Sequence, residues 1–333
     1  MDQAAEAQVA AGCPKRMIMG PCGGVRADGE CEVRPGPCAF DRPVSWGDPV
    51  RPVPLRATPL VLTDFTSQPF SVPALRSVAA VLAPACDAVL VGEHHNRPDF
   101  PPALHAALLL EAGVRPWMTL ACRDRNRVVL EQELMGLRHI GVDAVLCVTG
   151  DARGYDVRPD VTQVFDLDGP RLAARAAALG LPAVVPETPA APPRPLRGFR
   201  LAQKQRAGAA AAVLNHASAP VVAEFMVSAA QAGVTIPVIA AVAVFTDAPS
   251  AGVLTGLPGL DLDPAAVGAV LSDPDPVQAG IRAAAHEALA LLAIPGVVGV
   301  NLSGLGSARG YEFAASVKAQ IAGLIREQHG HGG

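Results

Sequence analysis

Polar side chains follow several of the apolar runs in this chain, and they are of the types that bind polar ligands. Carboxylates, amides, imidazoles and guanidinium groups accept or donate hydrogen bonds, and some of them exchange protons. The following positions are therefore the candidates for contact with a ligand: Asp64, Glu93, His94, Arg123, Asp124, Asn126, Asp151, Glu187, Asn215, His216 and Asn301.

The densest of these stretches is "CRDRN" at residues 122–126, directly behind the apolar run "PWMTLA". Only 17% of the chain is charged, so a cluster of charges at this point calls for a local reason. We interpret it as the place where a strand leaves the core and meets a polar ligand. The alternative is that Asp124 and Asn126 cap the following helix and that the arginines lie in solvent.

Four cysteines lie in a segment rich in glycine and proline, "CPKRMIMGPCGGVRADGECEVRPGPC". They are Cys13, Cys22, Cys31 and Cys38, separated by eight, eight and six residues. Such a segment buries little apolar surface, and four thiolates around zinc would supply the missing stabilisation. An iron–sulfur cluster with four cysteine ligands is a second possibility, and a loop of reduced cysteines without a ligand is the third.

The composition restricts the class of protein. Half of the 333 residues are apolar, only 4% are aromatic, and the net charge of -4 comes from mixed signs without a basic stripe, which argues against a nucleic-acid partner. No uninterrupted apolar run approaches the roughly 20 residues that span a bilayer, and the first residues are acidic where a signal peptide is basic. We expect a cytoplasmic protein without a membrane partner.

Eight short apolar runs alternate with Ala- and Leu-rich stretches of helical period, which predicts parallel strands joined by right-handed crossovers. The expected strands are residues 59–65, 87–94, 116–122, 143–151, 181–187, 210–216, 236–244 and 297–304. Eight such units predict an α/β fold of the (β/α)8 TIM-barrel class, with the ligand site at the carboxyl ends of the strands. A doubly wound open sheet is the alternative.

The chain divides into two parts on this pattern. Residues 1–57 form a short Cys-rich N-terminal extension, a candidate metal-binding module, and residues 58–333 form the barrel that carries the ligand site. Residues 249–296 are longer than one barrel unit requires, so we expect an insertion with extra helix before the last strand.

Several motifs resemble those of methylenetetrahydrofolate reductases. The block "TLACRDRNRVVLEQELMGLRHIGVDAVLCVTGD" (119–151) is similar to a bacterial subgroup whose members read close to "TCRDRN" and then "LTGD". Weaker matches are "VFDLDGPRL" (164–172), "KQRAGAAAAVLN" (204–215) and "GVNLSG" (299–304). The N-terminal cysteine segment is similar to a module that some members carry at or beyond the other end of the chain.

The resemblance implies a folate-binding (β/α)8 barrel that reduces 5,10-methylenetetrahydrofolate to 5-methyltetrahydrofolate with NADH or NADPH. It implies that Asp64 is the catalytic acid, where relatives have a glutamate. Asn215 stands where the family carries a glutamine that contacts the folate, and Asp151, which matches a family aspartate near the flavin, is a further candidate for substrate contact. Other strand-end residues, Glu93, His94, Arg123, Asp124 and Asn126, are further candidates for substrate contact. Candidates for contact with a cofactor are Thr119, Cys122, Lys204 and Glu187, of which Lys204 matches a flavin-phosphate lysine.

The sequence also departs from the family at positions that hold FAD. Gly92 replaces a flavin-contacting threonine, Thr119 stands where many members have histidine, and Arg197 replaces an aspartate that helps to hold the flavin. An aromatic residue beside the folate glutamine is His216 in this chain. Two possibilities therefore stay open: a flavoprotein with FAD, or an enzyme that passes hydride directly from NADH to the folate.

Two other functions remain as alternatives. One is a folate-dependent one-carbon transferase that acts on a different substrate without a redox step. The other is a non-catalytic subunit whose cysteine segment docks onto a redox partner. A homo-oligomer is compatible with each of these possibilities.

Overall fold

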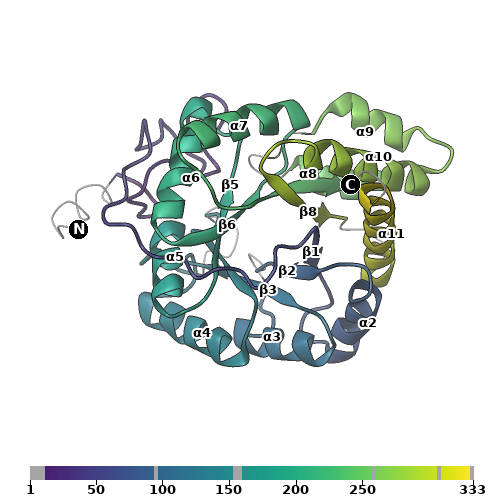
Figure 1. Ribbon diagram of the computed structural model, residues 1–333, viewed down its shortest axis with the longest axis horizontal. Helices are drawn as coiled ribbons and strands as arrows, with labels where there is room; N and C mark the ends of the chain where they lie inside the picture. The colour runs from purple at the N-terminus through teal and green to yellow at the C-terminus, as the bar shows by residue number, and fades with distance from the viewer. Residues whose placement is uncertain are drawn as a thin grey trace.

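Eight parallel strands close into a barrel in the computed structural model, which describes residues 12–93, 97–152, 160–256, 260, 262–305 and 309–330 (Figure 1). The strands are β1 (Val61–Phe65), β2 (Ala88–Val91), β3 (Pro116–Ala121), β4 (Ala144–Val148), β5 (Ala183–Glu187), β6 (Ala209–Leu214), β7 (Val238–Val244) and β8 (Val297–Gly304). Each strand pairs with the next, and β8 returns to β1 with Val300 opposite Val61. This closure confirms the predicted barrel and excludes the open sheet.

Helices cover the outside of the barrel (Figure 1). They are α2 (Val72–Leu82), α3 (Pro102–Glu111), α4 (Arg127–Ile140), α5 (Gly169–Ala178), the short 3-10 helix η1 (Arg194–Leu196), α6 (Arg197–Arg206), α7 (Ala219–Gln231), α8 (Ala248–Thr255), α9 (Pro264–Leu271), α10 (Pro276–Leu292) and α11 (Tyr311–Gly330). The predicted insertion before the last strand contains α8, α9 and α10. Local signals explain several ends: the Asn126 side chain caps α4, and Gly141 ends it in the left-handed region.

The small aliphatic residues of the sequence fill two apolar layers. One layer lies inside the barrel and includes Leu62, Trp117 and Ile239, each at most 1% exposed. The larger layer lies between the strands and the helices. Because side chains of a strand alternate between its two faces, Leu62 and Asp64 both point inward, and Asp64 lies nearer the carboxyl end.

The N-terminal extension packs against the barrel on the side of α5 and α6 (Figure 1). The buried Asp168 side chain, which caps α5, accepts hydrogen bonds from the backbone nitrogens of Ile18 (3.0 Å) and Met19 (3.3 Å). Further along, the Trp46 backbone nitrogen donates to Gln203 Oε1 of α6 at 2.8 Å. The extension is therefore attached through specific polar contacts and through buried side chains.

Within the described part of the chain, no helix combines the length and the apolar character needed to cross a membrane.

Replacing Asp168 with alanine tests this attachment. Asp168→Ala leaves the backbone nitrogens of Ile18, Met19 and Arg171 without their acceptor, and each buried unsatisfied donor costs about 1–3 kcal/mol. We expect the free energy of unfolding to fall by about 3 kcal/mol or more and limited proteolysis to cleave the extension faster. Asp263→Ala is the matched control, because Asp263 caps α9 at an exposed position and its loss costs about 1 kcal/mol. Equal losses in the two variants, with an extension that stays protected, would contradict the attachment.

Candidate functional site

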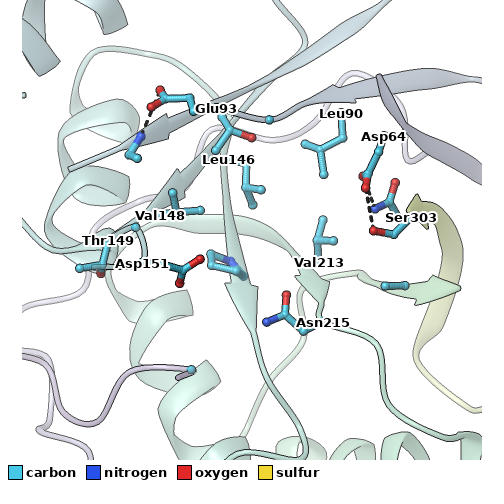
Figure 2. A pocket seen from close by; sticks show the side chains of 18 of the residues that line it. Asp64, Leu90, Glu93, Leu146, Val148, Thr149, Asp151, Val213, Asn215 and Ser303 are labelled. Carbon is cyan, nitrogen blue, oxygen red and sulfur yellow. Dashed lines mark hydrogen bonds between the residues drawn. The ribbon is translucent and has the colours of Figure 1, made fainter. Parts of the chain in front are cut away.

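A cavity of about 510 Å³ opens at the carboxyl ends of the strands, where a barrel of this class binds its ligand. We call it the mouth. Asp64 from β1, Asp151 from the segment after β4 and Asn215 from the segment after β6 all line it (Figure 2). Its apolar floor includes Leu90, Leu146 and Val213, which belong to the layer inside the barrel. The mouth thus combines an apolar floor with polar groups from separate strands.

Asp64 is held as a hydrogen-bond acceptor. Its Oδ1 accepts from Asn301 Nδ2 at 2.8 Å, and its Oδ2 accepts from Ser303 Oγ at 2.6 Å, both from β8. Its backbone oxygen accepts from Lys318 Nζ at 2.8 Å, and burial lowers the pKa of that lysine against the opposing attraction of Asp64. Both side-chain oxygens and the backbone oxygen of Asp64 are thus engaged by protein groups.

Glu93 is tied to Arg125, whose Nη1 lies 2.8 Å from both carboxylate oxygens. Burial raises the pKa of Glu93, and the attraction of Arg125 opposes this shift. Glu93 and the buried Thr119 line both the mouth and an adjoining cavity of about 500 Å³, which also contacts Asp124 and Arg125. The two cavities therefore share part of their walls.

The stretch "CRDRN" divides between three environments. Arg123 is 2% exposed, lines the mouth and binds Asp124 Oδ2 and the Asp151 backbone oxygen at 3.0 and 3.1 Å. Cys122 points into the layer behind the strands, where burial raises its pKa well above the usual value. Asn126 is exposed and caps α4, as the alternative interpretation of this residue states. Neither Cys122 nor Asn126 lines the mouth or the adjoining cavity.

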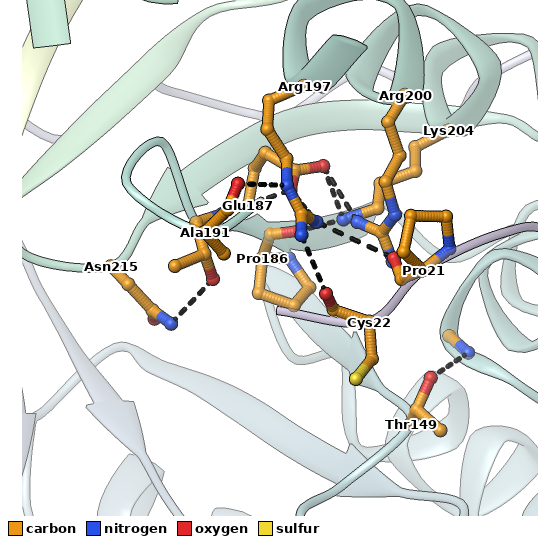
Figure 3. Close-up of polar contacts among 12 residues, drawn as sticks. Pro21, Cys22, Thr149, Pro186, Glu187, Ala191, Arg197, Arg200, Lys204 and Asn215 are labelled. Carbon is orange, nitrogen blue, oxygen red and sulfur yellow. Dashed lines mark hydrogen bonds and ion pairs between the residues drawn. The ribbon is translucent and has the colours of Figure 1, made fainter. Parts of the chain in front are cut away.

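A fully buried carboxylate, Glu187, gathers three cationic side chains at one side of the mouth (Figure 3). Its Oε2 lies 2.8 Å from Arg200 Nη1 and 2.9 Å from Lys204 Nζ, and its Oε1 lies 3.4 Å from Arg197 Nη1. We call these four residues the Glu187 cluster. It carries one negative charge against as many as three positive charges.

The cluster shifts the ionisation of its members. Burial alone would raise the pKa of Glu187, but Arg200, Lys204 and Arg197 outweigh it and hold that pKa far below its usual range. Burial and the repulsion of Arg200 lower the pKa of Lys204 to about 7, against the attraction of Glu187. Glu187 is thus ionised at neutral pH, and Lys204 is the cation of the cluster that loses its proton most easily.

The N-terminal extension forms one wall of the mouth, a role that the sequence did not predict. Arg197 of the Glu187 cluster donates to the backbone oxygens of Pro21 (3.5 Å) and Cys22 (2.8 Å), which draws the extension over the end of β5 (Figure 3). Lys15, which forms an ion pair with Glu32, lines the mouth together with Cys22. The signal in the sequence that could have indicated this contact was Arg197, which replaces an aspartate of the family.

The four cysteines of the extension surround a small cavity of their own. Cys22 also reaches the mouth, and burial raises the pKa of its thiol to about 11. Within the described residues no group of three or more His, Cys, Asp or Glu side chains has an arrangement that would hold a metal ion. In this arrangement the thiols do not fit a metal cage, and zinc binding at Cys13, Cys22, Cys31 and Cys38 stays a prediction.

At the predicted seat for a flavin phosphate, the cationic side chains are paired with protein groups. Lys204 donates to the Pro186 backbone oxygen and pairs with Glu187, and Arg197 is engaged by the extension. A phosphate at this point would have to displace both the carboxylate and the backbone carbonyls. Lys204 and Arg200 nevertheless line the mouth, and FAD binding at this position stays a prediction.

Three residues that line the mouth carry a buried atom that has no hydrogen-bond partner within the described part of the chain. The atoms are Arg200 Nε, His216 Nδ1 and Asn301 Oδ1. Buried polar atoms are nearly always satisfied, so a ligand with both donors and acceptors would complete them. His94 was also predicted to contact the ligand, but it lies outside the described residues.

Replacing Glu187 with glutamine tests the cluster. Glu187→Gln leaves buried cations without their counter-charge, and removing one partner of a buried ion pair costs about 3–5 kcal/mol. We expect a loss of this size in denaturant unfolding at neutral pH, with Glu224→Gln, an exposed position of α7, as the control. Because folding lowers the pKa of Glu187 from about 4.3, the loss is fully present above about pH 5 and shrinks as the pH falls toward the folded pKa. A loss below about 1 kcal/mol, as for exposed pairs, would contradict this role.

Comparisons with known proteins support the resemblance. Residues 2–46 match a family model described as "Methylene-tetrahydrofolate reductase C terminal". A solved structure titled "Uncharacterized protein from Clostridium thermocellum binds two copies of 5-methyl-5,6,7,8-tetrahydrofolic acid" shares the fold with a TM-score of 0.53 and 13% identity, over 81% of this chain and 96% of that one. No curated protein matches the chain. The N-terminal extension is therefore similar to a module of methylenetetrahydrofolate reductases, and the barrel shares its fold with the clostridial protein.

Proposed function

We propose that this protein reduces 5,10-methylenetetrahydrofolate to 5-methyltetrahydrofolate with hydride taken directly from NADH or NADPH. The observation that carries the proposal is the mouth itself, where Asp64, Asp151 and Asn215 from separate strands surround one cavity with an apolar floor. A pteridine is a flat ring with hydrogen-bond donors and acceptors on its edge, and this combination of groups suits it. The folate ligand of the structurally similar clostridial protein supports the same choice.

The polar residues divide the work of binding in this proposal. Asn215 lines the mouth, and its Nδ2 donates to Thr188 Oγ1 at 2.9 Å, which orients the amide. In this proposal the amide hydrogen-bonds the pteridine ring. The Asp64 carboxylate stabilises the positive charge of the iminium that forms when the folate ring opens. The apolar floor of Leu90, Leu146 and Val213 keeps water away from the carbon that receives the hydride.

We favour direct transfer without flavin, and the contacts of the Glu187 cluster support this choice. Where the resemblance predicts a flavin phosphate, Lys204 is paired with Glu187, and Arg197 donates to the backbone oxygen of Cys22. In this proposal the nicotinamide binds in the adjoining cavity, beside the folate. FAD is therefore not part of the proposed reaction.

An assay of the purified protein tests the proposal. We expect NADH or NADPH to be oxidised only when methylenetetrahydrofolate is present, with one 5-methyltetrahydrofolate formed for each nicotinamide oxidised, and with no flavin absorbance in the active preparation. The measurement follows the nicotinamide absorbance without oxygen and identifies the product by mass spectrometry. A folded protein that oxidises neither nicotinamide would contradict the reduction, and label passing from the folate carbon to another acceptor would indicate a transferase.

Asn215→Ala tests the binding mode. The loss of one hydrogen bond between neutral groups costs about 0.5–1.5 kcal/mol, so we expect KM for the folate to rise about 3- to 10-fold with little change in kcat. Asn215→Gln keeps the amide and serves as the matched control, with KM within about threefold of the wild-type value, because a smaller shift is under 0.7 kcal/mol. If Asn215→Ala binds the folate as tightly as the wild type, the amide does not contact it.

A further inference from the structure

His216 is a buried histidine in the mouth that the binding roles above leave unused. It follows Asn215, just after the end of β6. It is 4% exposed and lines the mouth beside Asn215. Its Nε2 lies 2.7 Å from Glu287 Oε1. Glu287 comes from α10, in the predicted insertion, and its Oε2 accepts from the Ala243 backbone nitrogen of β7 at 3.3 Å.

These contacts decide which nitrogen of the imidazole carries hydrogen. An ionised carboxylate only accepts, so the short contact to Glu287 places a hydrogen on Nε2. The lone pair of the neutral ring then lies on Nδ1, the buried atom without a hydrogen-bond partner in the described part of the chain. The same carboxylate stabilises the ring when Nδ1 also takes a proton. A histidine arranged in this way can both donate and accept a proton at Nδ1.

Asp64 is another candidate proton donor in the mouth, and its contacts suit a different role. Both of its carboxylate oxygens accept hydrogen bonds from β8 at 2.6–2.8 Å. With both oxygens engaged in this way, the carboxylate is suited to stabilise a cation on the ligand. Figure 2 shows Asp64 and Asn215, the neighbour of His216, on different strands around the same space. A ligand between β1 and β6 would meet both groups.

We propose that His216 is a catalytic residue of the mouth that donates the proton for opening of the folate ring, and that Glu287 is its positioning residue. This inference rests on the proposed function. The imidazolium transfers the proton on Nδ1 to the bridging nitrogen that is not part of the pteridine, and the bond between that nitrogen and the bridging carbon breaks. The bridging carbon becomes an iminium on the pteridine nitrogen and accepts hydride from the dihydronicotinamide, which is oxidised. His216 ends neutral and regains its proton from solvent.

A purely structural role is the competing explanation, because the pair also joins α10 to the ends of β6 and β7. The variant His216→Gln separates the two. A glutamine amide can still donate to Glu287 and so keep the link, but it cannot transfer a proton at neutral pH. A structural role therefore predicts near wild-type activity for this variant, whereas a proton donor predicts a large loss.

The test measures hydride transfer in a single turnover, with NADH and methylenetetrahydrofolate both saturating. We expect His216→Gln to lower the rate about 100-fold or more while the Kd for 5-methyltetrahydrofolate changes less than about threefold. Glu287→Gln, which acts through the imidazole, should lower the rate about 10-fold. His286→Gln on the exposed face of α10 is the matched control and should leave the rate unchanged.

Chemical rescue distinguishes a missing proton donor from a missing contact. We expect added imidazole to restore part of the activity of His216→Ala and none of that of Asp64→Asn. The loss of a general acid should lower the rate roughly 100-fold. If the wild type is active and His216→Gln transfers hydride within about threefold of the wild-type rate, the inference is wrong and the proposed function stands. If the wild type shows no folate-dependent hydride transfer, the proposed function fails and the role of His216 fails with it.

Discussion

The buried charge of Glu187 is the constraint on which the shape of the mouth depends. A carboxylate that is fully removed from water is tolerated only when cations and hydrogen bonds compensate it, and Arg197, Arg200 and Lys204 do so in this protein. Their combined charge exceeds that of Glu187, and Arg197 also donates to the backbone oxygens of the N-terminal extension. One electrostatic requirement therefore joins the extension to the barrel and makes the two a single binding site.

This arrangement gives the different acidic residues of the mouth different roles. Glu187 is structural, because its oxygens are consumed by the cluster and its pKa lies far below the usual range. Asp64, which accepts from Asn301 and Ser303, is suited to stabilise positive charge on the ligand. In our proposal, proton transfer belongs to His216, which is held by Glu287.

The barrel and much of its mouth follow from local features of the sequence, whereas the contacts between distant segments do not. Strand period and the alternation of strands and helices predict which residues lie at the carboxyl ends, and so Asp64, Asp151 and Asn215 were found. The same reasoning cannot tell whether a side chain at a strand end points inward or outward. Cys122 was therefore counted as a candidate, although it lies behind the sheet. It also cannot pair His216 with Glu287, 71 residues later, or place the extension over Arg197.

The most direct test of the proposed site is a crystal structure of the protein with 5-methyltetrahydrofolate. We predict that the pteridine lies in the mouth, between the ends of β1 and β6, with Asp64, Asn215 and His216 Nδ1 each within about 3.2 Å of a polar atom of the ligand. The Glu187 cluster and the extension should keep their positions when the ligand binds. A pteridine bound elsewhere, or one seated on the cluster after displacement of Pro21 and Cys22, would contradict this site.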